Sequence, residues 1–281
     1  MTIEKASKIG FCFGVRRAID IVEKAARGRG GVETLRAIVH NEPVLRKLAT
    51  MGVRVARDIG DIQGKVVAIS AHGVSPEVEE DIRQRNIEII DTTCPFVHRA
   101  QVVARRLNES GFFVVVYGDA NHPEVKGVLG WAKNRGMATI DSNFVASLNT
   151  LPRHVGVLSQ TTQVPADFNH FVKEVIDFAL TKDSELRIID TICYEIRERQ
   201  VAALELANRV DLMLVVGGHN SANSNHLAEL CSTITPTHLV ETASEIQKSW
   251  FGGRSQIGIT AGASTGDETI EEVVNYLESV T

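Results

Sequence analysis

The sequence lacks the features that mark membrane-spanning, secreted and common nucleotide-binding proteins. It has no run of 18 or more apolar residues, so we expect no membrane-spanning segment. The first stretch, MTIEKASKIGFCFGV, carries scattered charges and too short an apolar run for a secretory signal. We therefore expect a cytoplasmic protein with reduced cysteines. Neither G-x-G-x-x-G nor G-x-x-x-x-G-K-S/T occurs, which leaves nucleotide binding of those kinds without support.

Charge and cysteine usage exclude further classes. The 30 Lys and Arg residues against 35 Asp and Glu residues give a net charge of −5. This balance predicts no general attraction to nucleic acid or anionic lipid, so local groups must hold any anionic ligand. The four cysteines include no Cys-x-x-Cys pair, which argues against a structural zinc site. No linker rich in Pro, Gly and Ser separates parts of the chain.

What the sequence does contain is a threefold repeat. Cys12, Cys94 and Cys193 open the similar segments CFGVR, CPFVH and CYEIR, and helical periodicity follows each. Three apolar runs, KVVAIS, HVGVLS and SQIGIT, each lead through a polar loop to an acidic helix start. A third set runs from strand through polar loop to helix: LRAIVHNEPVLRKL, FFVVVYGDANHPEVKGVL and DLMLVVGGHNSANSNHLAEL.

This alternation predicts the fold. Short Val/Ile-rich runs between helices are typical of parallel strands with crossover helices. We predict an α/β protein of three small parallel-sheet domains in pseudo-threefold arrangement, covering residues 14–95, 96–190 and 191–281, with residues 1–13 packing near the third. Ligands of such sheets gather at the carboxyl ends of the strands, where all the repeated loops lie.

Three cysteines at equivalent bends point to a shared role. A lone cysteine is most often a buried apolar residue, and we assign Cys231, which has no repeat partner, to the core. Cys12, Cys94 and Cys193 fit an iron–sulfur cluster, with another metal or simple packing as the alternatives. A cluster with three cysteine ligands leaves one iron open as a Lewis acid.

The polar loops that should face these cysteines hold candidate anion-binding groups. Histidine, serine and asparagine side chains can donate hydrogen bonds to a diphosphate without a Walker loop, although NSANSNH could be only a helix cap. Glu124, beside His122, is either a proton donor with a raised pKa or a helix N-terminal acid. The candidates are His40, His72, His122, Glu124, Thr161, Thr162, Ser221, Asn223 and Ser264.

Nine segments in order, from residue 10 to about 270, carry a family resemblance. They are GFCFGVRRAI, VHNEPV, SAHGVSPEV, DTTCP, HPEVKG, SQTT, DTICYEIRERQ, NSANSN and TAGAS. Together they closely resemble the LytB/IspH family, the 4-hydroxy-3-methylbut-2-enyl diphosphate reductases. The resemblance implies three domains around one central 4Fe–4S cluster per chain, with one iron not ligated by protein. It also implies the last step of the methylerythritol phosphate route to isoprenoids, a reductive dehydroxylation that gives isopentenyl and dimethylallyl diphosphate.

The resemblance also implies roles for residues and partners. Cys12, Cys94 and Cys193 would ligate the cluster, Glu124 would supply protons, and Thr161 would position Glu124 and the substrate alcohol, with Thr162 in support. The allylic diphosphate would bind His40, His72, His122, Ser221, Asn223 and Ser264. The family often has NSSNSN where this chain has Ala222, so one hydroxyl donor is missing.

The resemblance further predicts a ferredoxin or flavodoxin type electron donor. We expect no nucleic-acid or membrane partner, and a monomer or weak homodimer. The alternatives are a quinolinate synthase-like enzyme with a three-cysteine cluster and a non-catalytic iron–sulfur sensor or carrier.

Overall fold

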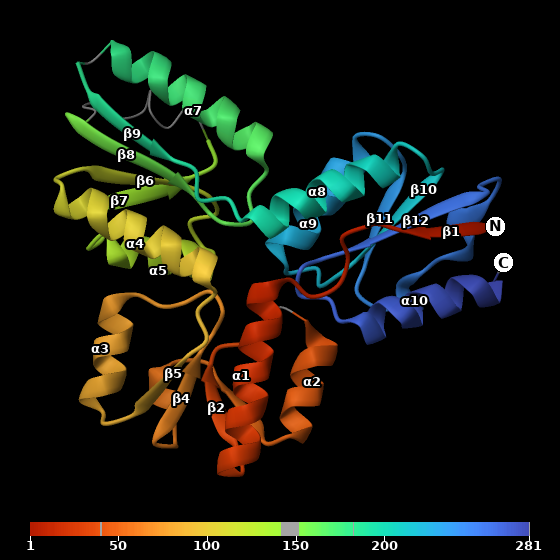
Figure 1. The fold of residues 1–281 in the computed structure, drawn as a ribbon, viewed down its shortest axis with the longest axis horizontal. Helices are drawn as coiled ribbons and strands as arrows, with labels where there is room; N and C mark the ends of the chain where they lie inside the picture. The colour runs from red at the N-terminus through yellow and green to blue at the C-terminus, as the bar shows by residue number, and fades with distance from the viewer. Residues whose placement is uncertain (40, 142–151, 182, 281) are drawn as a thin grey trace. The chain divides into compact units, whose positions relative to one another are not determined.

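A computed structural model describes residues 1–39, 41–141, 152–181 and 183–280 (Figure 1). Its strands form three four-stranded sheets, and neighbouring strands within each sheet are parallel. This confirms the predicted α/β class. The chain divides into two compact units. Unit 1 comprises Met1–Arg16, Val39–Met51 and Tyr194–Thr281, and unit 2 comprises Arg17–Ile38 and Gly52–Cys193. The division into three domains stays a prediction.

Unit 1 contains one sheet, in the order β1-β12-β10-β11. Its strands are β1 (Thr2–Lys5), β10 (Leu212–Val216), β11 (Thr237–Val240) and β12 (Gln256–Ala261). Its helices are α2 (Glu42–Thr50), α8 (Tyr194–Ala207), α9 (Ala222–Ser232) and α10 (Asp267–Val280), with short 3₁₀ turns η2 (Ala243–Glu245) and η3 (Lys248–Phe251). Helix α1 (Phe13–Arg29) begins in unit 1 and continues in unit 2.

Alternating side chains on β10 explain how the sheet of unit 1 is covered. Leu212 and Leu214 belong to the apolar cluster that includes α10, whereas Met213 and Val215 belong to the cluster formed with α8 and α9. Figure 1 shows α10 on one face of this sheet and α8 with α9 on the other. Cys231 of α9 is fully buried in the second cluster, and burial raises its pKa to about 11, which confirms it as a core residue.

Unit 2 contains the other two sheets, in the orders β3-β2-β4-β5 and β7-β6-β8-β9. The first has β2 (Val32–Leu35), β3 (Val53–Ala56), β4 (Val66–Ile69) and β5 (Glu88–Asp91), with η1 (Ile59–Asp61) and α3 (Pro76–Gln84). The second has β6 (Phe113–Tyr117), β7 (Gly136–Thr139), β8 (His154–Ser159) and β9 (Glu185–Ile189), with α4 (Pro95–Glu109), α5 (Pro123–Trp131) and α7 (Pro165–Leu180).

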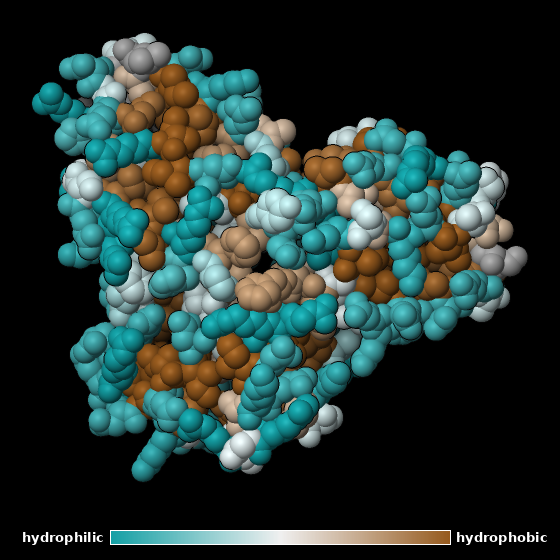
Figure 2. Space-filling model, in the orientation of Figure 1, coloured by the Kyte–Doolittle hydropathy of each residue, from teal (hydrophilic) through white to brown (hydrophobic). Residues whose placement is uncertain are grey.

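Apolar helix faces cover the sheets of unit 2. Residues of α4 and α5 pack on one face of β6 and β8, and Phe168, Phe171 and Val175 of α7 pack on the other. Figure 2 shows hydrophilic side chains over most of the visible surface and hydrophobic ones in bands between them, as amphipathic helices on apolar sheets require. Among the described helices, none is long and apolar enough to cross a membrane.

One expected strand lies elsewhere than the sequence indicated. The apolar run in LRAIVHNEP predicted a strand close to the histidine, but β2 ends at Leu35. The next residue, Arg36, has φ 65°, in the left-handed region that a strand does not use. The backbone turns there, and the N–H of Arg36 donates to the carbonyl of Ala56 at the end of β3.

Candidate functional site

The three repeated cysteines have equivalent local structures. Each lies between an edge strand of its sheet (β1, β5 or β9) and the first residue of a helix (α1, α4 or α8). Each backbone N–H donates to the carbonyl two residues past the neighbouring strand: Cys12 to Ala263 at 3.0 Å, Cys94 to Ala71 at 3.0 Å and Cys193 to Thr161 at 2.9 Å. The threefold pattern of the sequence is therefore a threefold pattern of backbone geometry, one cysteine at the carboxyl end of each sheet.

The surroundings of Cys12 illustrate how such a turn is held. The N–H of Val15 donates to Sγ of Cys12 at 3.4 Å, as expected at the start of a helix. Burial raises the pKa of the thiol, while that N–H and the charge of Arg199 act in the opposite direction. Arg199 is almost fully buried and donates to the carbonyls of Gly10 at 2.7 Å and Ala261 at 2.9 Å. The arginine thus joins the turn before α1 to the end of β12.

The chemistry of this donor set suits an iron–sulfur cluster. In the described ranges, no three His, Cys, Asp or Glu side chains lie close enough together to ligate one ion. In a 4Fe–4S cluster each thiolate binds a separate iron, so three cysteines from different turns can serve as ligands. Three thiols at helix starts, where backbone N–H groups stabilise thiolates, supply suitable ligands. Cys94 and Cys193 belong to unit 2 and Cys12 to unit 1, and their shared cluster stays a prediction.

Glu124 and Thr161 form a buried pair in unit 2. The N–H of Thr161 donates to Oε1 of Glu124 at 2.7 Å, and its hydroxyl donates to Oε2 at 2.8 Å. Glu124, in the first turn of α5, is only 2% exposed. Burial raises its pKa to about 7, although the bonds from Thr161 oppose the shift. Because the carbonyl of Thr161 accepts the N–H of Cys193, Thr161 connects this carboxyl to a cysteine turn.

Two of the predicted histidines meet in unit 2. The rings of His72 and His122 are edge to face, with centroids 5.3 Å apart and an interplanar angle of 83°. His122 is the N-cap of α5, and its Nδ1 accepts the N–H of Glu124 at 3.2 Å. A neutral His122 ring must then carry its proton on Nε2, which makes that atom a hydrogen-bond donor. Nδ1 of His72 lies 3.4 Å from the hydroxyl of Ser70.

The loop that carries His72 requires a glycine. Gly73 has φ +68°, and a Cβ there would lie 2.4 Å from Nε2 of Gln101 on α4. Gly73 N–H donates to the carbonyl of Ser70, which closes the turn around His72. The SAHGVS segment therefore has a backbone reason for its glycine, independent of any ligand.

In unit 1, polar groups gather after the neighbouring strands β10 and β12. Ser221 is the N-cap of α9, and its Oγ accepts the N–H of Ser224 at 3.4 Å. Asn223 is 4% exposed, and neither Nδ2 nor Oδ1 has a hydrogen-bond partner among the described residues. Leaving such an amide unsatisfied costs about 1–3 kcal/mol, and it lies at the positive end of a helix. Ser264, 8% exposed, follows β12. This end of the sheet suits an anion.

The remaining predicted residues have different outcomes. His40 lies outside the described residues. Ala222 begins α9 and has no side-chain donor, so only backbone N–H groups serve there. Thr162 accepts a hydrogen bond from Nε2 of Gln160 at 3.1 Å. Gln160 was not among the predicted residues, yet it is 1% exposed and also accepts the N–H of Asp119. A polar residue directly after a buried strand, in SQTT, was the available signal.

Comparisons with known proteins agree on one family. The family model described as LytB protein matches residues 3–278. A 4-hydroxy-3-methylbut-2-enyl diphosphate reductase of Dehalococcoides mccartyi (strain CBDB1) is 61% identical over 278 residues, 99% of this chain and 98% of that protein. One of Geobacter metallireducens is 40% identical over 281 residues, 100% of this chain and 98% of that protein.

Two solved structures have similar folds. The E-1-hydroxy-2-methyl-but-2-enyl-4-diphosphate reductase from Plasmodium falciparum superposes with a TM-score of 0.91 at 27% identity, covering 98% of this chain and 87% of that one. A structure of (E)-4-hydroxy-3-methyl-but-2-enyl diphosphate reductase, described as the terminal enzyme of the non-mevalonate pathway, gives a TM-score of 0.71. It is 35% identical and covers 99% of this chain and 100% of that one.

Proposed function

This chain belongs to the LytB family and is a 4-hydroxy-3-methylbut-2-enyl diphosphate reductase of the non-mevalonate isoprenoid pathway, and we propose how its own residues perform that step. The reaction takes up two electrons and two protons, releases the substrate hydroxyl as water, and yields isopentenyl and dimethylallyl diphosphate. The chain must therefore bind a diphosphate, hold a redox group and deliver protons.

Cys12, Cys94 and Cys193 are the proposed ligands of one 4Fe–4S cluster per chain. Their equivalent N–H to carbonyl bonds at 2.9–3.0 Å support a shared role for the three turns. When bound, such a cluster supplies the electrons for C–O cleavage and, at its iron without a protein ligand, a Lewis acid for the hydroxyl. Cys231, buried in the core of unit 1, is not among the ligands.

Glu124 is the proposed proton donor, and the contact between Glu124 and Thr161 is the observation that carries this proposal. A carboxyl with a pKa of about 7 is partly protonated at neutral pH, as a general acid must be. Thr161 fixes both carboxyl oxygens and, through its carbonyl, the N–H of Cys193. The proton source is thereby tied to the turn of a proposed cluster ligand.

The diphosphate is proposed to bind His72 and His122 in unit 2, and Ser221, Asn223 and Ser264 in unit 1. Nε2 of His122 is oriented as a donor by the N–H of Glu124. The unsatisfied amide of Asn223, at the start of α9, gives a second donor that a phosphate oxygen would satisfy. His40 completes the proposed set from sequence, and Thr162 supports the Thr161 loop. At Ala222, a backbone N–H takes the place of the missing hydroxyl.

The test is turnover by the cluster-loaded protein. Protein reconstituted anaerobically with iron and sulfide is given the allylic diphosphate, dithionite and a viologen, and both products are quantified by mass spectrometry. We expect both C5 diphosphates to form, and no product from protein without iron. Cluster-loaded protein without turnover would leave the sensor or carrier as the better account. The natural donor is proposed to be a ferredoxin or flavodoxin, and the location cytoplasmic.

A further inference from the structure

A pocket of about 380 Å³ lies in unit 2 at the carboxyl end of the sheet β3-β2-β4-β5. That volume is within the range of small-molecule sites. Leu35 and Arg36, which end and follow β2, line it together with Ser70, which follows β4. From β2 the chain continues to β3 on one side, and from β4 it continues to β5 on the other. The crevice between β2 and β4 is thus the switch point where parallel sheets bind ligands.

This pocket lies beside two of the residues assigned to the substrate, because Ser70, Gly73 and Pro123 of its lining are within two residues of His72 or His122. None of His72, His122, Ser221, Asn223 and Ser264 is among its lining residues. Its apolar side chains come from β2, η1, the β4–α3 region and the start of α5: Leu35, Ile59, Val74, Val78 and Pro123. No aromatic side chain among the described residues lines it, so it offers no platform for stacking a nucleobase.

Two cations line the same pocket. The guanidinium of Arg36 and the ammonium of Lys126, both exposed, have no hydrogen bond or ion pair within the part of the chain that the structure describes. The one acid in the described lining, Asp58, uses Oδ1 to accept the N–H groups of Gly60 at 2.7 Å and Asp61 at 3.2 Å. Arg36 also has the strained φ of 65°, and such backbone outliers cluster at ligand sites.

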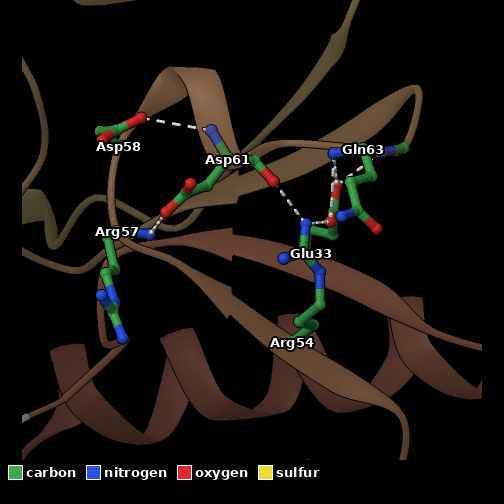
Figure 3. A network of polar contacts seen from close by, with 7 residues as sticks. Glu33, Arg54, Arg57, Asp58, Asp61 and Gln63 are labelled. Atoms are coloured by element: carbon green, nitrogen blue, oxygen red, sulfur yellow. Dashed lines mark hydrogen bonds and ion pairs between the residues drawn. The ribbon is translucent and has the colours of Figure 1, made fainter.

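Polar contacts connect η1 and the residues after it to Glu33 of β2 and Arg54 of β3 (Figure 3). Oε2 of Glu33 accepts the N–H groups of Gln63 at 3.0 Å and Gly64 at 2.7 Å, and Glu33 also pairs with Arg54. Arg54 donates in turn to the carbonyl of Asp61 at 2.6 Å. Contacts that fix a wall in the free protein lower the entropic cost of binding a small ligand.

We propose that this pocket is a second ligand site that binds an isoprenoid diphosphate, with Arg36 and Lys126 holding the diphosphate and the apolar lining receiving the hydrocarbon chain. Two cations in one lining suit the high charge of a diphosphate, and Arg adds directed hydrogen bonds. The apolar side chains of the lining would remove the hydrocarbon chain from water. The choice of ligand class rests on the proposed function, because the products of this enzyme are the smallest isoprenoid diphosphates.

Equilibrium dialysis of labelled geranyl diphosphate against anaerobic, cluster-loaded protein tests the site. Without a reductant the substrate does not turn over, so it can be added in about tenfold excess over its dissociation constant. We expect geranyl diphosphate to remain bound under this condition. Arg36→Gln and Lys126→Gln should each weaken the retained binding about tenfold, the loss expected for one charged hydrogen bond. Lys173→Gln, which changes a lysine on α7 in the other sheet's helix layer, is the matched control and should leave binding unchanged.

A variant that fills the pocket separates charge from hydrophobic recognition. Val78→Phe should weaken the binding of geranyl diphosphate and leave the binding of inorganic diphosphate unchanged. All these variants should keep normal turnover. Two results overturn the second site: complete displacement of geranyl diphosphate by the substrate, and an unchanged affinity for geranyl diphosphate in the double variant Arg36→Gln and Lys126→Gln. Equal affinity of the native protein for inorganic and geranyl diphosphate overturns the isoprenoid class. Normal turnover without retained geranyl diphosphate rejects this pocket alone, whereas absent turnover rejects the proposed function.

Discussion

Replacing Glu124 by glutamine removes a proton donor while keeping the contacts around it. The amide oxygen can accept the N–H of Thr161, and the amide nitrogen can donate to its hydroxyl, so both contacts at 2.7 and 2.8 Å persist. The loop after β8 should stay in place, and the Cys193 turn with it. General acid catalysis typically contributes about 10²–10⁴-fold, so we expect turnover to fall by that factor.

The same substitution should change how stability depends on pH. Folding raises the pKa of Glu124 from 4.5 to about 7, so the folded state binds its proton more tightly than the unfolded state does. The native protein is therefore favoured at low pH, and this advantage is lost as the pH rises from 4.5 through 7. The difference corresponds to about 3 kcal/mol. Glutamine does not titrate, so its stability does not fall in this way. Between pH 4.5 and pH 8, the free energy of unfolding of the variant should therefore rise by about that much relative to that of the native protein.

Urea unfolding at both pH values and steady-state kinetics measure these effects. Cluster absorption and substrate affinity should remain close to native in Glu124→Gln, and the native rate should fall above pH 7 as Glu124 ionises. Glu229→Gln, which changes a carboxyl on α9, is the control for losing a negative charge. If the free energies of unfolding of Glu124→Gln and native protein depend on pH in the same way, Glu124 does not titrate as a buried carboxyl. Native turnover in the variant would refute the proton donor.

Four further substitutions, one of them a control, test the other parts of the site. Cys193→Ser should abolish the visible absorption of the cluster. Cys231→Ser, in the core, should retain this absorption and lower only the stability of the protein. Loss of the absorption in both variants would contradict the assignment of ligands. Thr161→Val removes a hydroxyl that lowers the pKa of Glu124, so the rate should begin to fall at a higher pH than in the native protein. An unchanged pH dependence of the rate would argue against this coupling. Asn223→Ala should raise KM about tenfold or more with a smaller change in kcat, since a buried hydrogen bond to a charged group contributes about 1.5–3 kcal/mol, and an unchanged KM would exclude Asn223 from the diphosphate site.

Much of the fold was predictable because its signals are local. The runs KVVAIS and HVGVLS correspond to β4 and β8, whose hydrophobic residues are largely buried as parallel strands require. The strand near His40 was predicted too late in the chain, because apolar composition does not reveal the left-handed backbone at Arg36. The short strand β3 passed unnoticed, since its alternation over four residues is too brief to stand out.

The sequence alone determined the α/β class and the equivalent bends of Cys12, Cys94 and Cys193, because strand and helix periods and a repeated motif act over a few neighbouring residues. Tertiary structure decided what the side chains can do. Residues 124 and 161 are 37 positions apart, yet their contact and shared burial set the proton affinity of Glu124. The proton position on His122 and the unsatisfied amide of Asn223 likewise depend on the folded surroundings. Burial and hydrogen bonding are properties of the packed chain, and no local pattern encodes them.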